Sequence, residues 1–233
     1  MTGQTGRQLA LNVQLRDDAT LENYLPSGTS ELLLQSLQEQ LSPRGEPIIF
    51  VHGPVDSGRT HLLQAACHLA GAEAQYLPLA ELQAYPPAEI LQSIETLKLV
   101  CLDDLQAVLG QAEWERELFH LFNRARDNHC RLLVSADAAP RALEVDLADL
   151  RSRLGWGIVY RLPTVTDEQR QQLIIFRAAR RGLSLAPEVA SYIVSRAPRS
   201  MDSLLDLLDT LDKASLAEQR SLSIPFVKVT LGW

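Results

Sequence analysis

One eight-residue segment of the 233-residue chain limits its possible folds more than any other. An apolar run, residues 48–52, leads into it, and residues 60–70, which have a helical pattern, follow it. The segment has the spacing G-x-x-x-x-G-K-[ST], in which backbone N–H groups surround an anion at the start of a helix. The sequence therefore predicts a nucleotide-phosphate site, with an incidental glycine turn as the competing interpretation. Its residues are Gly53, Pro54, Val55, Asp56, Ser57, Gly58, Arg59 and Thr60.

Two positions of this loop and a pair of aspartates carry the expected chemistry. Arg59 replaces the lysine of the motif; its guanidinium can bind phosphate but is bulkier, so we expect binding to survive and catalysis to suffer. Thr60 is the expected Mg²⁺ ligand. A second apolar run, residues 98–102, ends in Asp103 and Asp104. Asp103 would orient the water shell of the magnesium, whereas Asp104 is one methylene shorter than the glutamate of vigorous hydrolases, which predicts weak hydrolysis. A turn after a strand is the alternative for this pair.

The rest of the chain alternates short apolar runs with helical patterns, which is typical of parallel strands joined by crossover helices. After Pro163 only helical patterns follow. We predict an α/β fold with a five-stranded parallel sheet and a small C-terminal α-helical domain, divided into a flexible arm (1–20), an α/β domain (21–163) and a helical domain (164–233). The expected strands are 48–52, 74–77, 98–102, 131–136 and 158–162. The clearest expected helices are 60–70, 113–127, 167–181, 187–197 and 201–217.

Composition narrows the class of protein. Hydrophobic residues make up 46% and charged residues 22%, as in globular proteins, and no uncharged apolar run approaches the roughly 20 residues of a spanning helix. The start of the chain has no apolar block of secretory length. Cys67, Cys101 and Cys130 are odd in number and lie in apolar stretches, which favours core positions in a reducing compartment. We expect a cytoplasmic protein without a membrane partner and without a zinc site.

Charge is distributed unevenly around a net value of −7. Residues 116–199 hold 14 bases, all arginine, against 9 acids, whereas residues 1–115 hold 5 bases against 15 acids. Most of these arginines are expected to form ordinary surface ion pairs. Autonomous binding to duplex DNA is not predicted, because no groove-entering motif accompanies them.

Four segments together resemble the AAA+ core of the bacterial replication initiator DnaA. They are the phosphate loop, residues 102–104, residues 118–123 (Leu-Phe-His-Leu-Phe-Asn) and residues 151–157 (Arg-Ser-Arg-Leu-Gly-Trp-Gly). The C-terminal run 220–228 makes the sequence more similar to the Hda family, the regulatory inactivators of DnaA. We expect no counterpart of the helix-turn-helix domain that follows this core in DnaA. The resemblance implies an AAA+ core with a helical lid domain.

The resemblance also implies residues that contact partners. Gln8, Leu9 and Leu11 match a peptide that tethers the family to the DNA polymerase III β sliding clamp, and hence indirectly to DNA; a frayed terminus is the alternative. Arg153 matches an arginine finger that reaches the γ-phosphate of a neighbouring subunit, with an interior ion pair as the alternative. Phe119 and Asn123 match positions that face DnaA, although Phe119 could equally be a core residue.

The same resemblance completes the expected nucleotide site. Asp137 matches the first sensor position, and Tyr24 and Leu25 lie in the segment that covers the adenine. His61 continues the phosphate loop. Asp202 occupies the place of a second sensor arginine, which removes a phosphate-facing cation and predicts poor hydrolysis in cis. The expected cofactor is ADP or ATP, with Mg²⁺.

Three functions remain open at this point. The first is a negative regulator of replication initiation that stimulates hydrolysis of DnaA-bound ATP through Arg153 and leaves inactive ADP-DnaA. The second is a self-contained AAA+ ATPase that loads or remodels a replication factor. The third is an adaptor that bridges clamp and initiator without finger chemistry. A homo-oligomer is compatible with each, because AAA+ domains assemble head to tail.

Overall fold

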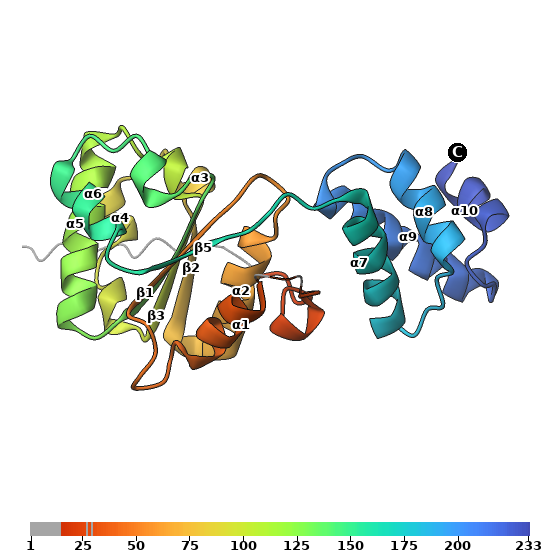
Figure 1. Ribbon diagram of the computed structural model, residues 1–233, viewed down its shortest axis with the longest axis horizontal. Coiled ribbons are helices and arrows are strands. Elements are labelled where there is room, and N and C mark those ends of the chain that lie inside the picture. The colour runs from red at the N-terminus through yellow and green to blue at the C-terminus, as the bar shows by residue number, and fades with distance from the viewer. Residues whose placement is uncertain (1–14, 27, 29) are drawn as a thin grey trace, which may run out of the picture. The chain divides into compact units, whose positions relative to one another are not determined.

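The computed structural model describes residues 15–26, 28 and 30–233. The chain divides into two compact units, with the boundary between Pro163 and Thr164. The first unit contains all the strands that the described residues form, and the second contains helices (Figure 1). Each unit is described by itself below.

The first unit is built on a five-stranded sheet in the order β2-β3-β4-β1-β5. Every neighbouring pair is parallel. The prediction of five parallel strands is confirmed, with bounds that differ by at most one residue at an end. The strands are β1 (Ile48–His52), β2 (Ala74–Pro78), β3 (Leu99–Asp103), β4 (Arg131–Ala136) and β5 (Ile158–Arg161).

Helices cover both faces of this sheet (Figure 1). On one face lie α1 (Ser30–Glu39) and α2 (Arg59–Ala70). The other face is covered by α3 (Leu79–Leu82), α4 (Pro87–Ile90), α5 (Ala112–Asp127) and α6 (Ala148–Leu154). The sequence predicted α2 and α5, whereas α1, α3, α4 and α6 were not assigned as helices from the sequence, because three of them are too short to show a helical period.

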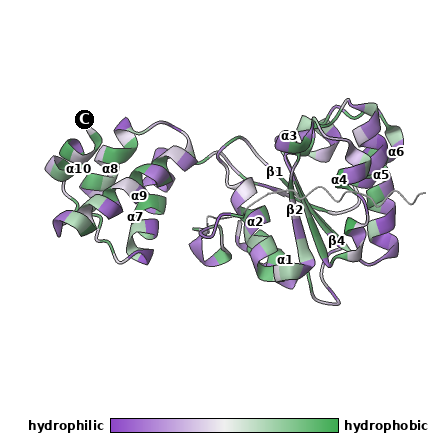
Figure 2. Ribbon diagram, turned by 180° about the vertical axis from the view of Figure 1, so that it is seen from behind, coloured by the Kyte–Doolittle hydropathy of each residue, from purple (hydrophilic) through white to green (hydrophobic). Residues whose placement is uncertain are grey.

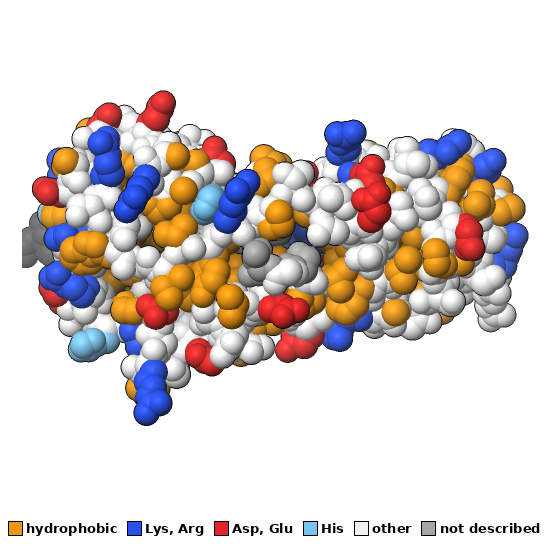
Figure 3. Space-filling view, in the orientation of Figure 1, with side chains coloured by type: hydrophobic (Ala, Val, Ile, Leu, Met, Phe, Trp, Pro, Cys, Tyr) orange, Lys and Arg blue, Asp and Glu red, His pale blue; other side chains and the backbone are white. Residues whose placement is uncertain are grey.

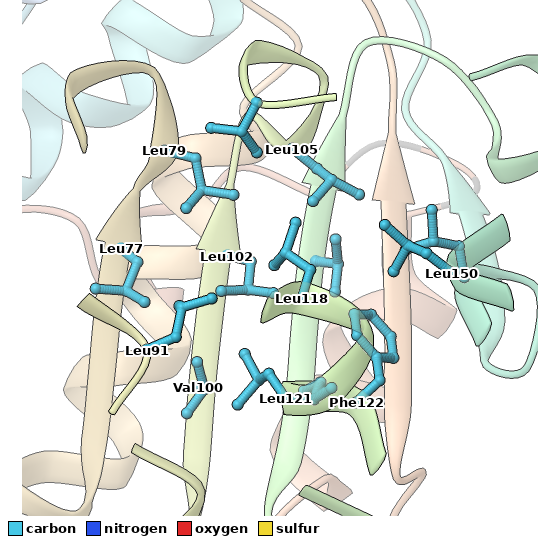
Figure 4. Packing of buried hydrophobic residues seen from close by; sticks show 14 of the residues in the cluster. Leu77, Leu79, Leu91, Val100, Leu102, Leu105, Leu118, Leu121, Phe122 and Leu150 are labelled. Atoms are coloured by element: carbon cyan, nitrogen blue, oxygen red, sulfur yellow. The ribbon is translucent and has the colours of Figure 1, made fainter. Parts of the chain in front are cut away.

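The core consists of two clusters, one on each face of the sheet, because successive strand residues point to opposite faces. In β1, Ile48 and Phe50 join the cluster under α5, whereas Ile49 and Val51 join the cluster under α2. Figure 2 shows the strands largely in the hydrophobic colour. Figure 4 shows how side chains of α5 lie over the strands; the labelled residues are Leu77, Leu79, Leu91, Val100, Leu102, Leu105, Leu118, Leu121, Phe122 and Leu150.

Buried cysteines belong to these clusters. Cys67 and Cys101 lie in the cluster under α2 and Cys130 in the cluster under α5, and all three are free thiols. Their prediction as core residues is therefore confirmed. Burial raises the pKa of the Cys130 thiol to about 11, which keeps it protonated at neutral pH.

The second unit consists of α7 (Asp167–Arg180), α8 (Pro187–Arg196), α9 (Met201–Glu218) and α10 (Ile224–Leu231). Thr166 caps α7 in a reciprocal capping box with Gln169. The apolar stripe of α9 packs into a separate hydrophobic core with residues of the other three helices. The sequence predicted the first three helices; α10 was not assigned.

Among the residues described, no helix combines the length and the apolar character that crossing a membrane requires.

Candidate nucleotide site and arginine cluster

The phosphate loop connects the end of β1 to the start of α2, as the motif requires. Gly58 has φ +92°, a conformation that glycine adopts without strain. A Cβ atom on Gly53 would lie 2.6 Å from the backbone oxygen of Leu162 and 2.9 Å from Ser57 Oγ. Both glycines are therefore required by the backbone path. The hydroxyl of Ser57 is buried inside the loop, and no hydrogen-bond partner for it exists among the described residues.

Arg59 lies at the first position of α2, and its guanidinium is buried. It donates to the backbone oxygens of Gly53 and, at 3.1 Å, Ala136. It also forms a salt bridge with Asp104, with Nη2 2.7 Å from Oδ1. The replacement of lysine by arginine thus gives a group with enough donors to join the loop, β4 and the residue after β3.

The two aspartates after the apolar run of β3 have different environments. Asp103 is 2% exposed and accepts hydrogen bonds from Tyr76, at 2.7 Å, and from Ser135. Burial and the Asp103 carboxylate raise the pKa of Tyr76 well above its usual range, so this donor stays protonated. Asp104 is partly exposed and has φ +55°. The buried carboxylate of Asp103 thus joins β3 to β2 and β4, whereas the accessible carboxylate of Asp104 pairs with Arg59.

Gln106 links Asp104 to the expected sensor residue. Its amide nitrogen donates to Asp104 Oδ1 at 3.0 Å, and its amide oxygen accepts from the backbone N–H of Asp137 at 3.2 Å. The Asp137 side chain is exposed. The sequence did not predict Gln106, Tyr76 or Ser135, because each reaches the site from a different strand or turn and no local spacing marks them.

Tyr24 lies against the same loop. A Cβ atom on Gly58 would lie 3.2 Å from Cε2 of Tyr24, and the ring centroids of Tyr24 and His61 are 5.8 Å apart. His61 is held by the backbone oxygen of Thr20, 2.9 Å from its Nε2. Leu25 follows and is partly buried. The structure therefore brings the residues expected over the adenine to the start of α2.

The loop's own chemistry fits a phosphate group. The buried hydroxyl of Ser57 has no partner among the described residues and could donate to a phosphate oxygen, and Gly53 packs so closely on Leu162 that it leaves no space for a side chain. For magnesium, Thr60 is exposed at the start of α2 and Asp103 is buried at the end of β3. Within residues 15–26, 28 and 30–233, no group of three or more His, Cys, Asp or Glu side chains could hold a metal ion. A magnesium ion would thus depend on phosphate oxygens for much of its coordination.

A second cluster surrounds Arg153 in the last turn of α6. Its Nε donates to Asn123 Oδ1 at 3.0 Å. Its guanidinium carbon lies 5.4 Å from the ring centroid of Phe119 and 3.9 Å from that of Trp156. Three residues that the sequence singled out thus meet in one place. Phe119 is partly buried, packs against the core and contacts Arg153, so its core interpretation is supported and its role toward DnaA stays a prediction.

Trp156 is the member of this cluster to which no role was assigned from the sequence. Its ring is 47% exposed and also lies 5.6 Å from the guanidinium carbon of Arg126. It borders a small pocket lined mostly by apolar side chains, namely Pro47, Ile48, Phe122, Ala125, Arg126, Cys130 and Leu132.

Arg126 and Arg153 belong to the arginine-rich middle of the sequence. Figure 3 shows Lys and Arg side chains of the first unit dispersed among acidic and hydrophobic ones.

The two sites lie at opposite ends of the parallel strands. The phosphate loop follows the last residue of β1, whereas Trp156 precedes the first residue of β5, and β1 and β5 are parallel in the register Ile49 to Ile158. The Trp156 pocket also includes Ile48 and Leu132, at the beginnings of β1 and β4. A five-residue strand spans roughly 16 Å. The Arg153 cluster therefore lies at the opposite end of the strands from the phosphate loop of its own chain.

The residues expected at the clamp-binding peptide and at the second sensor position belong to neither cluster. Gln8, Leu9 and Leu11 lie outside the described residues. Asp202 is exposed in the first turn of α9, in the second unit.

The fold is shared with known proteins. Domain III of the replication initiation protein DnaA from Thermotoga maritima superposes with a TM-score of 0.75 at 20% identity, covering 94% of this chain and 98% of that one. AMPPCP-bound DnaA from Aquifex aeolicus gives a TM-score of 0.70 at 23% identity, covering 88% of this chain and 70% of that one. With the sheet order, the phosphate loop and the helical unit, these matches show the fold: an α/β domain of the DnaA type followed by a helical unit.

Sequence comparisons identify the family. The model of the bacterial DnaA ATPase domain matches residues 80–161, and the model of the Hda lid domain matches residues 167–231. An uncharacterized protein of Haemophilus influenzae (strain ATCC 51907 / DSM 11121 / KW20 / Rd) is 44% identical over 229 residues, 97% of this chain and 98% of that one. The chain belongs to the Hda family of DnaA-related AAA+ proteins, and the predicted resemblance is confirmed.

Proposed function

We propose that this chain is a negative regulator of replication initiation that supplies Arg153 to the nucleotide site of ATP-bound DnaA. The arginine completes that site, hydrolysis follows, and ADP-DnaA is left inactive. Membership of the Hda family supports the choice of DnaA as partner. In this mechanism the chain activates hydrolysis in another protein and needs no vigorous hydrolysis of its own.

One observation carries the proposal: Arg153 lies beside Phe119 and Asn123, at the end of the strands opposite the phosphate loop of its own chain. A guanidinium there cannot reach its own nucleotide, but it can reach one bound to a neighbour that packs against α5 and α6. The aromatic faces and the Asn123 amide hold the guanidinium in place before the encounter, so less freedom is lost on binding. A fixed guanidinium at a γ-phosphate is worth roughly 10³ to 10⁵ in rate.

The chain's own loop has a different task in this proposal. An adenine nucleotide, most simply ADP, binds at residues 53–60 with Tyr24 beside it, and Mg²⁺ would be held by Thr60 with Asp103. When bound, the nucleotide supplies a phosphate charge that the loop N–H groups would neutralise. Asp104 forms a salt bridge with Arg59, so its carboxylate is engaged within the chain and is poorly placed to activate a water molecule. The site is therefore suited to retain a nucleotide and to stabilise the fold.

The sliding clamp is the second proposed partner. Gln8, Leu9 and Leu11 match the family's clamp-binding peptide, and we propose that they bring the chain to clamp loaded on DNA. An extended arm with two leucines and a glutamine amide can dock in an apolar pocket with few other contacts.

The decisive experiment follows the hydrolysis of labelled ATP already bound to DnaA, in the presence of clamp and DNA. Wild type is compared with Arg153→Ala and with Arg151→Ala, a matched control two residues earlier in α6 whose guanidinium bonds to the backbone oxygen of Val145 instead. We expect acceleration by wild type and by Arg151→Ala, and none by Arg153→Ala. Retained binding of nucleotide and clamp by Arg153→Ala would show that the variant is folded.

The other two functions give different results in the same assay. Steady turnover by the chain alone, abolished by Asp103→Ala and unaffected by Arg153→Ala, would replace the proposal by a self-contained ATPase. Full activity of Arg153→Ala together with loss of activity in Gln8→Ala would replace it by an adaptor.

A further inference from the structure

Glu115, in the first turn of α5, is almost completely buried, and backbone groups surround its carboxylate. Its side chain is 1% exposed, and its carboxylate accepts hydrogen bonds from three backbone N–H groups. Oε1 lies 2.9 Å from the nitrogen of Gly110 and 3.1 Å from that of Asp146, and Oε2 lies 2.6 Å from that of Leu147. A buried carboxylate is costly unless it is well hydrogen-bonded, and three backbone donors satisfy this one. Glu115 therefore forms a junction between α5, the turn at Gly110 and the segment before α6.

The junction lies where α6 begins. Leu147 is the N-cap residue of α6, and Asp146 precedes it. Leu150 and Leu154 bury one side of this seven-residue helix, and Glu115 fixes its N-cap residue against α5. A helix of this length is about 10 Å long and behaves as a rigid rod, so a shift at its start is carried to its last turn. Arg153 lies in that last turn.

Glu115 also shares a face of α5 with the residues that hold Arg153. Positions 115, 119 and 123 are spaced by four, which places their side chains along one side of a helix. Glu115 contacts the start of α6, and Phe119 and Asn123 contact Arg153 near its end. The two helices lie side by side (Figure 1). One stripe of α5 therefore holds α6 at both ends.

We propose that Glu115 is a positioning residue for the Arg153 finger: through three backbone hydrogen bonds it sets the start of α6 and thereby the place of the guanidinium. This inference rests on the proposed function and extends it to a residue that contacts neither nucleotide nor partner. Glu115→Gln keeps the shape of the side chain but replaces one acceptor oxygen with an NH₂ group, which faces the same donors and cannot accept from them.

The test measures the maximal rate of DnaA-bound ATP hydrolysis and the protein concentration that gives half of it. Because an arginine finger acts in the transition state, Glu115→Gln should lower the maximal rate by about tenfold or more and leave the half-maximal concentration within about twofold. The matched control is Glu113→Gln, an exposed glutamate of the same helix turn, which should keep both values. Nucleotide binding by Glu115→Gln should equal that of wild type.

Each other outcome overturns a particular statement. Full activity of Glu115→Gln beside an inactive Arg153→Ala removes the positioning role and leaves the proposed function intact, whereas full activity of Arg153→Ala removes the proposed function itself. A changed half-maximal concentration at unchanged maximal rate would make Glu115 part of general partner binding and overturn the inference. Should Glu115→Gln fail to fold, hydrogen exchange of wild type decides: fast exchange at the Asp146 and Leu147 amides would refute the junction.

Discussion

The two arginine-centred regions of the first unit hold their guanidinium groups by different means. Arg59 is buried and donates to two backbone oxygens and to the Asp104 carboxylate. Arg153 is only partly buried and is held by one amide oxygen and by the faces of Phe119 and Trp156. Hydrogen bonds to carbonyl and carboxylate oxygens fix direction, whereas a stacked guanidinium can slide over a ring at small cost.

This difference shows how one residue type serves two purposes. Around Arg59 the donors are used within the chain, and the group ties the loop to β4 and to the residue after β3. Around Arg153 the hydrogen bond to Asn123 uses Nε, and the aromatic ring faces carry no competing charge. We infer that an arginine that acts on another molecule is held by weaker and less directional contacts near the surface. The following predictions test this contrast.

The largest effect is expected from Arg153→Lys. Lysine keeps the charge but loses the planar fork that stacks on Trp156 and can contact a phosphate through two N–H groups. We expect stimulated hydrolysis of DnaA-bound ATP to fall about a hundredfold, a loss smaller than that of Arg153→Ala. A lysine variant with more than half of the wild-type rate would mean that a point charge suffices and that the stacking geometry is irrelevant.

The loss of stability in urea should be larger for a substitution at Arg59 than for one at Arg153. Arg59→Ala leaves the oxygens of Gly53 and Ala136 and the Asp104 carboxylate without their donor, so we expect the free energy of unfolding to fall by about 2 kcal/mol. Arg153→Ala should cost less than about 1 kcal/mol, because its contacts are near the surface. Equal losses for the two variants would contradict the contrast.

Trp156→Ala removes one support of Arg153 without touching its hydrogen bond to Asn123. A cation–π contact is worth about 1 kcal/mol at a partly exposed site, so we expect the stimulated rate to fall about fivefold to tenfold. Trp233→Ala, which alters an exposed tryptophan of the second unit, is the control. A loss in the control as large as that of Trp156→Ala would argue against a specific role.

The smallest effect concerns pH at the phosphate loop. Burial, and then the charges of Arg161 and Arg59, lower the pKa of His52 below its usual 6.5. Because the folded state holds this histidine neutral, stability is present above pH 6.5 and is lost as the pH falls through the lowered folded pKa. His52→Asn should therefore flatten the decrease in unfolding free energy below pH 6.5, measured by urea titration at several pH values. An unchanged slope would assign the acid sensitivity to other groups.

Much of the fold could be predicted from the sequence because its signals are local. Apolar runs such as residues 98–102 and 131–136 correspond to β3 and β4, and glycine spacing marked the loop before α2. By contrast α1 and α6 were not assigned. The seven residues of α6 include only two buried ones, and its start is fixed by Glu115 from another helix, so no periodic signal was available.

Consecutive residues were enough to predict the class of the protein, since the phosphate loop, the alternation of strands and helices and the motif around Arg153 are local patterns. The pairs of groups that meet became known from the packed fold: Arg59 with Asp104, Asp103 with Tyr76, and Arg153 with Asn123 and Trp156. The reason is physical. Strand and helix periods depend on neighbours within a few residues, whereas hydrogen bonds and ring contacts join residues whose distance is set only when the sheet and its helices pack.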